Sequence, residues 1–139
     1  MKKIIVFFLI GVVIVSCKQT ITDKDITKIN GYWEIQKVKL PQGDKKEYKV
    51  NETIDFFEIK NKIGFRQKVM PQLNGTYLTN NIKENITISK VGGNFYMNYS
   101  TNFGKWKEEI IEVKDSVLVL KNEANLEYHY KRQVPFSIK

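Results

Sequence analysis

The feature that most constrains the fold is a succession of short, apolar or alternating segments, separated by turn-forming residues, that fills the chain from residue 31 onward. Pro71, Asn74-Gly75, Gly92-Gly93 and Asn102-Phe103-Gly104 each interrupt the pattern in a way that is typical of hairpin connections. No stretch between these turns has sustained helical periodicity. The sequence therefore predicts an all-β domain.

Nine candidate strands lie between the turns, over residues 32–40, 48–59, 63–70, 76–79, 85–90, 94–101, 105–113, 117–121 and 126–133. Every connection is short, so strands adjacent in sequence should be adjacent in space and antiparallel. An open sheet of this width has two bare edges that invite aggregation, and closure into a barrel removes them. We expect an up-and-down antiparallel β-barrel of about eight strands; a two-sheet sandwich is the alternative.

Alternation of side chains predicts which residues point into the barrel. The more apolar face of the three clearest strands consists of Ile63, Phe65, Gln67, Val69, Phe95, Met97, Tyr99, Leu126, Tyr128, Tyr130 and Arg132. Trp106 and Glu108 are further candidates for the inner face. The alternation breaks at Phe56-Phe57 and Ile110-Ile111, where we expect a bulge or a strand buried on both faces.

Six inward residues are candidates for the lining of a ligand cavity: Phe65, Gln67, Phe95, Met97, Tyr99 and Tyr128. An eight-stranded barrel either fills its interior with side chains or keeps room for one small ligand. Apolar walls with a few orienting polar groups suit a pocket for an apolar ligand. The same residues suit an ordinary packed core, so the sequence leaves both interpretations open.

The first sixteen residues form a targeting segment. Lys2 and Lys3 precede an apolar run over residues 4–15, which is shorter than the roughly 20 residues that span a bilayer. The run ends in Ile14-Val15-Ser16-Cys17, which resembles the bacterial lipobox, in which the cysteine is acylated after cleavage. We therefore interpret residues 1–16 as a lipoprotein signal peptide, 17–29 as a lipidated tether and 30–139 as the barrel domain.

Lipidation of Cys17 would consume the only thiol of the chain. No disulfide or cysteine-based metal site could then form. The mature chain would carry 21 basic and 15 acidic residues, and its lysines are scattered among acids. Nucleic-acid binding favours a clustered basic stripe, so we expect no nucleic-acid partner. The expected partner is a membrane, reached through the lipid on Cys17.

Gly31-x-Trp33 on the first strand and Arg132 near the end of the last strand resemble the lipocalins and, more closely, the bacterial lipocalin-like lipoproteins. The resemblance covers residues 30–133. It implies that Trp33 packs against Arg132 and closes the narrow end of a cup, and that the cup holds a small apolar or amphipathic ligand. Lys18 after the cysteine implies, by resemblance to sorting rules, anchoring to the bacterial outer membrane, on its periplasmic or surface face.

Groups for catalysis are sparse. His129 is the only histidine and falls on the expected outer face of the last strand, while Glu108 and Glu109 point to opposite faces. We therefore expect a monomeric binding protein, not an enzyme, without a metal or cofactor. The alternative is a solid-core interaction module of the cell envelope, either an assembly factor or an enzyme inhibitor, with an exposed aromatic patch around Tyr96.

Overall fold

The computed structural model describes residues 19–48 and 51–135 of the chain. A one-turn helix and a 3-10 turn precede nine strands, and the bounds of the elements are α1 Asp23–Ile26, η1 Thr27–Ile29, β1 Gly31–Lys39, β2 Lys45–Glu47, β3 Ile54–Lys60, β4 Ile63–Pro71, β5 Tyr77–Val91, β6 Asn94–Thr101, β7 Gly104–Val113, β8 Val117–Asn122 and β9 Glu127–Arg132.

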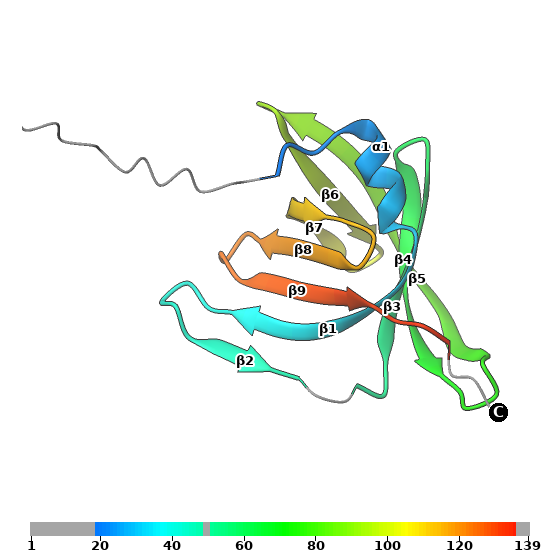
Figure 1. The fold of residues 1–139 in the computed structure, drawn as a ribbon. Helices are drawn as coiled ribbons and strands as arrows, with labels where there is room; N and C mark the ends of the chain where they lie inside the picture. The colour runs from blue at the N-terminus through cyan, green and yellow to red at the C-terminus, as the bar shows by residue number, and fades with distance from the viewer. Residues whose placement is uncertain (1–18, 49–50, 136–139) are drawn as a thin grey trace, which may run out of the picture.

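Eight of these strands form a closed antiparallel barrel (Figure 1). The ring runs β1-β3-β4-β5-β6-β7-β8-β9, and β9 pairs back with β1 over most of its length. β2 pairs only with the far half of β1 and lies outside the ring. Neighbours in the ring are neighbours in sequence apart from this insertion, so the predicted up-and-down barrel of about eight strands is confirmed.

Two strands differ from their predicted bounds. The segments predicted at 76–79 and 85–90 are one continuous strand, β5, because Asn80 and Asn81 form a bulge and not a turn. Asn81 has a φ of 60°, and its amide N–H donates to the hydroxyl of Thr79. The predicted strand 48–59 begins only at Ile54, and the short β2 lies upstream of it.

The segment predicted as a polar tether is docked against the barrel over residues 19–29. Thr22 and Asp25 form a capping box that starts α1, with the Thr22 N–H 2.9 Å from the Asp25 carboxylate. Ile21, Ile26 and Ile29 are buried in the core, and α1 lies over one end of the barrel (Figure 1). No helix in the described ranges is long and apolar enough to cross a bilayer.

This end of the barrel is closed by Trp33 and Arg132. The indole is fully buried, its Nε1–H donates to the carbonyl of Ile29 at 2.8 Å, and the Arg132 guanidinium lies 4.0 Å from the ring centroid. Arg132 also donates to the backbone carbonyls of Lys28, Asn30 and Asp115. This is the arrangement that the resemblance implies. It ties the first strand, the last strand and the N-terminal segment together.

Gly31 allows the guanidinium to approach this closely. Its φ is +118°, and a Cβ at this position would lie 2.6 Å from Nη1 of Arg132. Any side chain would therefore meet both backbone strain and a clash with the arginine. Position 31 is therefore a glycine because the Arg132 guanidinium occupies the space that a side chain would need.

The closed half of the barrel is filled with apolar side chains. Its fully buried members come from nearly every strand and from the N-terminal segment, and they include Ile29, Phe57, Ile86, Phe95, Met97, Ile110, Val113, Leu118 and Leu120. The predicted inward faces of β6 and β9 are confirmed, since Met97, Tyr99 and Tyr130 are buried. Phe56 and Phe57 lie on opposite faces of a regular strand, whereas β7 has a bulge after Ile110.

The predicted inward face of β4 is wrong. Gly64 and Arg66 point into the barrel, and Phe65 lies on the outer face, where its ring contacts Phe56 and the ammonium of Lys83. Ile63 is 66% exposed. Phe65 belongs to an outer aromatic cluster that continues through Phe56 to Tyr32 and Tyr77, and the ring centroids of these two tyrosines lie 3.9 Å apart.

Candidate ligand-binding cup

The half of the barrel opposite α1 contains a cavity of about 300 Å³. Six strands of the ring or their flanking loops contribute to its wall, which consists of Trp33, Ile35, Thr53, Ile54, Asp55, Arg66, Lys68, Trp106, Glu108, Asn122, Tyr128 and Tyr130. Trp33 therefore has two roles, because it closes the narrow end and also borders this open cup. The barrel interior is a packed core at one end and a cavity at the other.

Ionic side chains converge on the inner wall of the cup. Arg66 donates from Nε and Nη2 to the two carboxylate oxygens of Glu84, both at 2.9 Å, and its Nη1 lies 3.4 Å from Oε1 of Glu108. Its guanidinium also lies 4.5 Å from the centroid of the Tyr99 ring. Strands β4, β5, β6 and β7 each supply one of these residues, so the network joins four consecutive strands of the ring. The two-point contact with Glu84 holds the guanidinium in one orientation.

Burial shifts the proton affinities of this network. Desolvation raises the pKa of Glu108 above its ordinary value, and Tyr99 and Arg66 only partly offset it. Desolvation also raises the pKa of Tyr99 and Tyr130, so both phenols stay neutral. Burial opposes the charge of Arg66, but Tyr99, Glu84 and Asp55 outweigh it and raise the pKa of the guanidinium. The cup therefore holds a permanent cation beside a carboxyl group that protonates readily.

A second ion pair lies on the cup wall, between β3 and β4. The carboxylate of Asp55 is buried and lies 2.6 Å from Nζ of Lys68, whose side chain is 56% exposed. Opposite them, the Asn122 side chain donates to the hydroxyl of Tyr128 at 3.2 Å. Asp55 is buried in the barrel wall, whereas Lys68 reaches it from the solvent side. The cup thus combines aromatic walls with a few charged groups, the composition typical of small-molecule sites.

The residues predicted to line a cavity are distributed over three places. Tyr128 lines the cup. Phe95, Met97 and Tyr99 point inward but are fully buried in the core cluster, where Tyr99 supports the cup from behind through its contact with Arg66. Phe65 and Gln67 lie on the outer face of β4, with Gln67 paired to Phe56. Binding by any of these residues stays a prediction.

Sequence reasoning missed three charged residues of the cup wall, Asp55, Arg66 and Lys68, and Glu84, which lies behind Arg66. A charged residue in a strand ordinarily indicates the solvent face, and the apolar neighbours of Arg66 reinforced that reading. The sequence did contain one indication that Arg66 could be internal. Glu84 lies directly opposite Arg66 on the neighbouring strand, so an acid is available to pair with the arginine. Trp106 and Glu108, which were candidates for the inner face, both line the cup.

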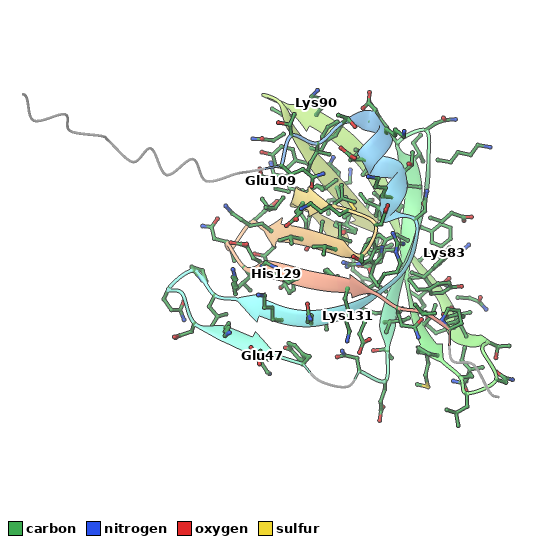
Figure 2. The ribbon with its side chains drawn as sticks, in the orientation of Figure 1. Glu47, Lys83, Lys90, Glu109, His129 and Lys131 are labelled. Carbon is green, nitrogen blue, oxygen red and sulfur yellow. The ribbon has the colours of Figure 1, made fainter. Side chains whose placement is uncertain are left out.

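Other titratable groups lie on the outside. Lys83, Lys90, Glu109 and Lys131 surround the barrel (Figure 2). The side chain of His129 is 17% exposed and lies 3.4 Å from Glu127. Burial, with the nearby charges of Lys39 and Lys37, lowers the pKa of this histidine.

In residues 19–48 and 51–135, no group of three acids, histidines or cysteines is placed to hold a metal. The predicted lipidation site, Cys17, lies outside the described residues.

Replacing Glu108 by glutamine is expected to stabilise the protein more at pH 8 than at pH 4. The pKa of Glu108 is raised on folding, so the native state favours the protonated carboxyl. That contribution to stability is complete below the pKa of the unfolded chain and is lost as pH rises through the folded pKa. The glutamine side chain does not ionise, so the variant does not lose this stability as the pH rises. Urea unfolding of both proteins across this range measures the difference, and a gap that shrinks with rising pH would contradict the assignment.

An up-and-down antiparallel barrel of eight strands, packed at one end and open at the other, is the lipocalin-like architecture. No protein-family model matches the sequence, and no curated protein sequence matches it significantly. Among solved structures, the chain is similar to a lipocalin-like protein from Bacteroides uniformis, with 13% identity and a TM-score of 0.47, over 76% of this chain and 99% of that one.

Two apocrustacyanins are also similar in structure to the chain. Apocrustacyanin C1 has 11% identity and a TM-score of 0.47, over 87% of this chain and 73% of that one. Apocrustacyanin C2 has 12% identity and a TM-score of 0.47, over 84% and 67% of the two chains.

Proposed function

We propose that this protein is a membrane-anchored binding protein whose cup holds one small amphipathic molecule. The observation that carries the proposal is the cavity of about 300 Å³, which combines aromatic walls with buried ionic groups in the open half of the barrel. This volume lies at the lower end of the roughly 300–1,000 Å³ that is typical of ligand pockets. The ligand is therefore small, with an apolar body against Trp106 and Tyr128 and a polar group near Glu108.

The alternative of a wholly solid core fits the interior less well. A packed barrel would place apolar side chains at Arg66 and Glu108, since burying charges costs free energy unless each is paired. Here the charges are retained beside a cavity and held in fixed positions by Glu84 and Tyr99. Fixed polar groups facing open space are what ligand orientation requires.

The anchor of this proposal is an acylated Cys17, in the outer membrane of a bacterium. The side-chain amide of Gln19 donates to the carbonyl of Val113, and its oxygen accepts from the Val113 N–H, at the closed end of the barrel. Two residues span at most about 7 Å, so the lipid would attach beside α1. The closed end would then face the membrane, and the cup would open away from it. Mass spectrometry of the membrane-extracted protein tests the anchor: an intact signal peptide or an unmodified Cys17 would contradict it.

Native mass spectrometry of the full chain, purified in mild detergent from a bacterial host, tests the cup. We expect an additional small-molecule mass that is lost on denaturation. Replacing Tyr128 by alanine should reduce the bound fraction by about tenfold, because the ring and its hydroxyl form part of the wall.

The matched control is Tyr96→Ala, which removes the same side chain from the outer face of β6, where its ring lies near Lys107. This variant should retain the bound mass. A protein that stays bare after incubation with envelope lipid and metabolite extracts would favour the interaction module instead.

A further inference from the structure

We propose that the cup selects organic cations, in the form of a small aromatic or apolar body that carries one protonated amine. This inference deepens the proposed function and rests on it. It follows from the balance of charge in the cup, from the way Arg66 is already neutralised, and from the aromatic residues in the wall.

With Glu108 ionised, the charged groups of the cup have an excess of one acid. Asp55, Glu84 and Glu108 face Arg66 and Lys68, and all five belong to strands β3, β4, β5 and β7. Four of these side chains border the cavity, and Glu84 lies behind Arg66. A bound cation would balance the set, whereas a bound carboxylate would raise the excess to two acids. Because the site is partly desolvated, such an imbalance weighs more than it would in water.

Arg66 is unsuited to recognising an anionic ligand. Its Nε and Nη2 are committed to the two oxygens of Glu84, and Nη1 points toward Glu108. The guanidinium face lies against Tyr99. An arginine that binds a ligand carboxylate usually offers its two-point edge to that ligand, and here this edge is occupied by the protein. Arg66 serves to hold Glu108 and Glu84 in place.

Glu108 is the carboxylate that Arg66 pairs less closely. Its contact with Arg66 is 3.4 Å, longer than the 2.9 Å contacts of Glu84, and its side chain is only 6% exposed. The groups that face it are Asp55, Arg66, Glu84, Tyr99 and Tyr130, and the Tyr99 hydroxyl hydrogen-bonds to its carboxyl group. A ligand amine beside Glu108 would form a charge-assisted hydrogen bond that is stronger than the 3.4 Å contact with Arg66. The body of the ligand would then lie among the aromatic residues of the wall, Trp33, Trp106, Tyr128 and Tyr130. Aromatic rings attract a cation through their faces.

The same arrangement predicts how binding depends on pH. Burial raises the pKa of Glu108, so the carboxylate protonates at a higher pH than an exposed glutamate. A protonated Glu108 has no charge to offer an amine. Affinity for an organic cation should therefore fall with decreasing pH, and the fall should begin at a higher pH than an exposed glutamate would give, while affinity for a neutral analogue of the same shape should not change.

The test uses three probes that share a phenyl ring and a short chain: 2-phenylethylamine, 2-phenylethanol and 3-phenylpropanoate. Their binding to the full chain in mild detergent is measured by calorimetry and by the fluorescence of the two tryptophans. We expect the amine to bind at least about tenfold more tightly than the alcohol or the carboxylate. Glu108→Gln should lower the affinity for the amine by about tenfold and so abolish this preference, with a much smaller change for the alcohol.

The matched control is Glu58→Gln, the same substitution on the exposed outer face of β3, which should keep the preference for the amine. Equal affinity for amine and alcohol, or preference for the carboxylate, would overturn the cation inference while leaving the cup as a ligand site. Absence of binding by all three probes at about 10 mM would also overturn it, because this concentration would fill even a site with a millimolar dissociation constant. The native mass measurement then decides the proposed function separately.

Discussion

Replacing Trp33 by alanine is expected to lower the free energy of unfolding by about 3–5 kcal/mol. The indole is fully buried between the core and Arg132, and its Nε1–H satisfies the carbonyl of Ile29. Its removal creates a cavity, leaves that carbonyl without its donor, and deprives Arg132 of the ring on which it lies. Urea unfolding at low temperature measures the loss, since domains of this size are stable by only about 5–15 kcal/mol in total.

The control for Trp33 is Phe103→Ala, because this aromatic ring is fully exposed in the turn between β6 and β7. It should change the stability by less than about 0.5 kcal/mol. Trp33→Phe provides an intermediate case, which keeps most of the apolar volume but loses the hydrogen bond to Ile29. If the alanine variant unfolds with the midpoint of the parent protein, Trp33 is not the residue that closes the barrel.

Replacing Gly64 by alanine is expected to cost about 3 kcal/mol or more, although the residue lies in an ordinary strand. Gly64 pairs with Ile59 on β3 and Ile86 on β5 and faces the interior. A Cβ there would fall onto the carbonyl oxygen of Glu58 and would lie 2.7 Å from its carbon and 2.8 Å from Cα of Ile59. The obstacle is backbone, so no side-chain rotation can relieve it, and β3 and β4 would have to separate.

Gly93→Ala isolates the other cost of removing a glycine. Gly93 has a φ of +84° in the turn between β5 and β6, and a Cβ there would meet no atom within 4 Å. That variant should lose only about 1 kcal/mol, from backbone strain alone. Thermal unfolding of both proteins compares the two effects. Equal losses at the two positions would mean that the strands at Gly64 separate without cost and that the close approach is not structurally important.

The turns and the strongest alternations were predictable from the sequence because they are local. The connections at Asn61-Lys62, Gly92-Gly93 and Asn102-Gly104 follow from asparagine and glycine, which favour turns, and they are present in the structure. The inward faces of β6 and β9 follow from a clean two-residue period. With short connections throughout, these signals suffice to predict the closed barrel.

The position of the N-terminal segment was not predictable in the same way. Residues 19–29 have a polar composition with three isolated isoleucines, which is the pattern expected of a tether. The structure buries Ile21, Ile26 and Ile29 at the closed end. Their burial depends on an apolar opening that exists only once eight strands have closed, and no property of the segment itself reveals that opening.

Taken alone, the sequence determined a closed antiparallel barrel of about eight strands, through turn chemistry and alternation, and its resemblance to the lipocalins indicated Trp33 and Arg132 as the pair at the narrow end. Only the tertiary structure decided which face of β4 is internal and what the cup contains. Arg66 can be buried because Glu84 and Glu108 reach it from two other strands. A hydrophobic pattern treats each strand separately, whereas the free energy of a buried charge depends on partners that the closed barrel brings together.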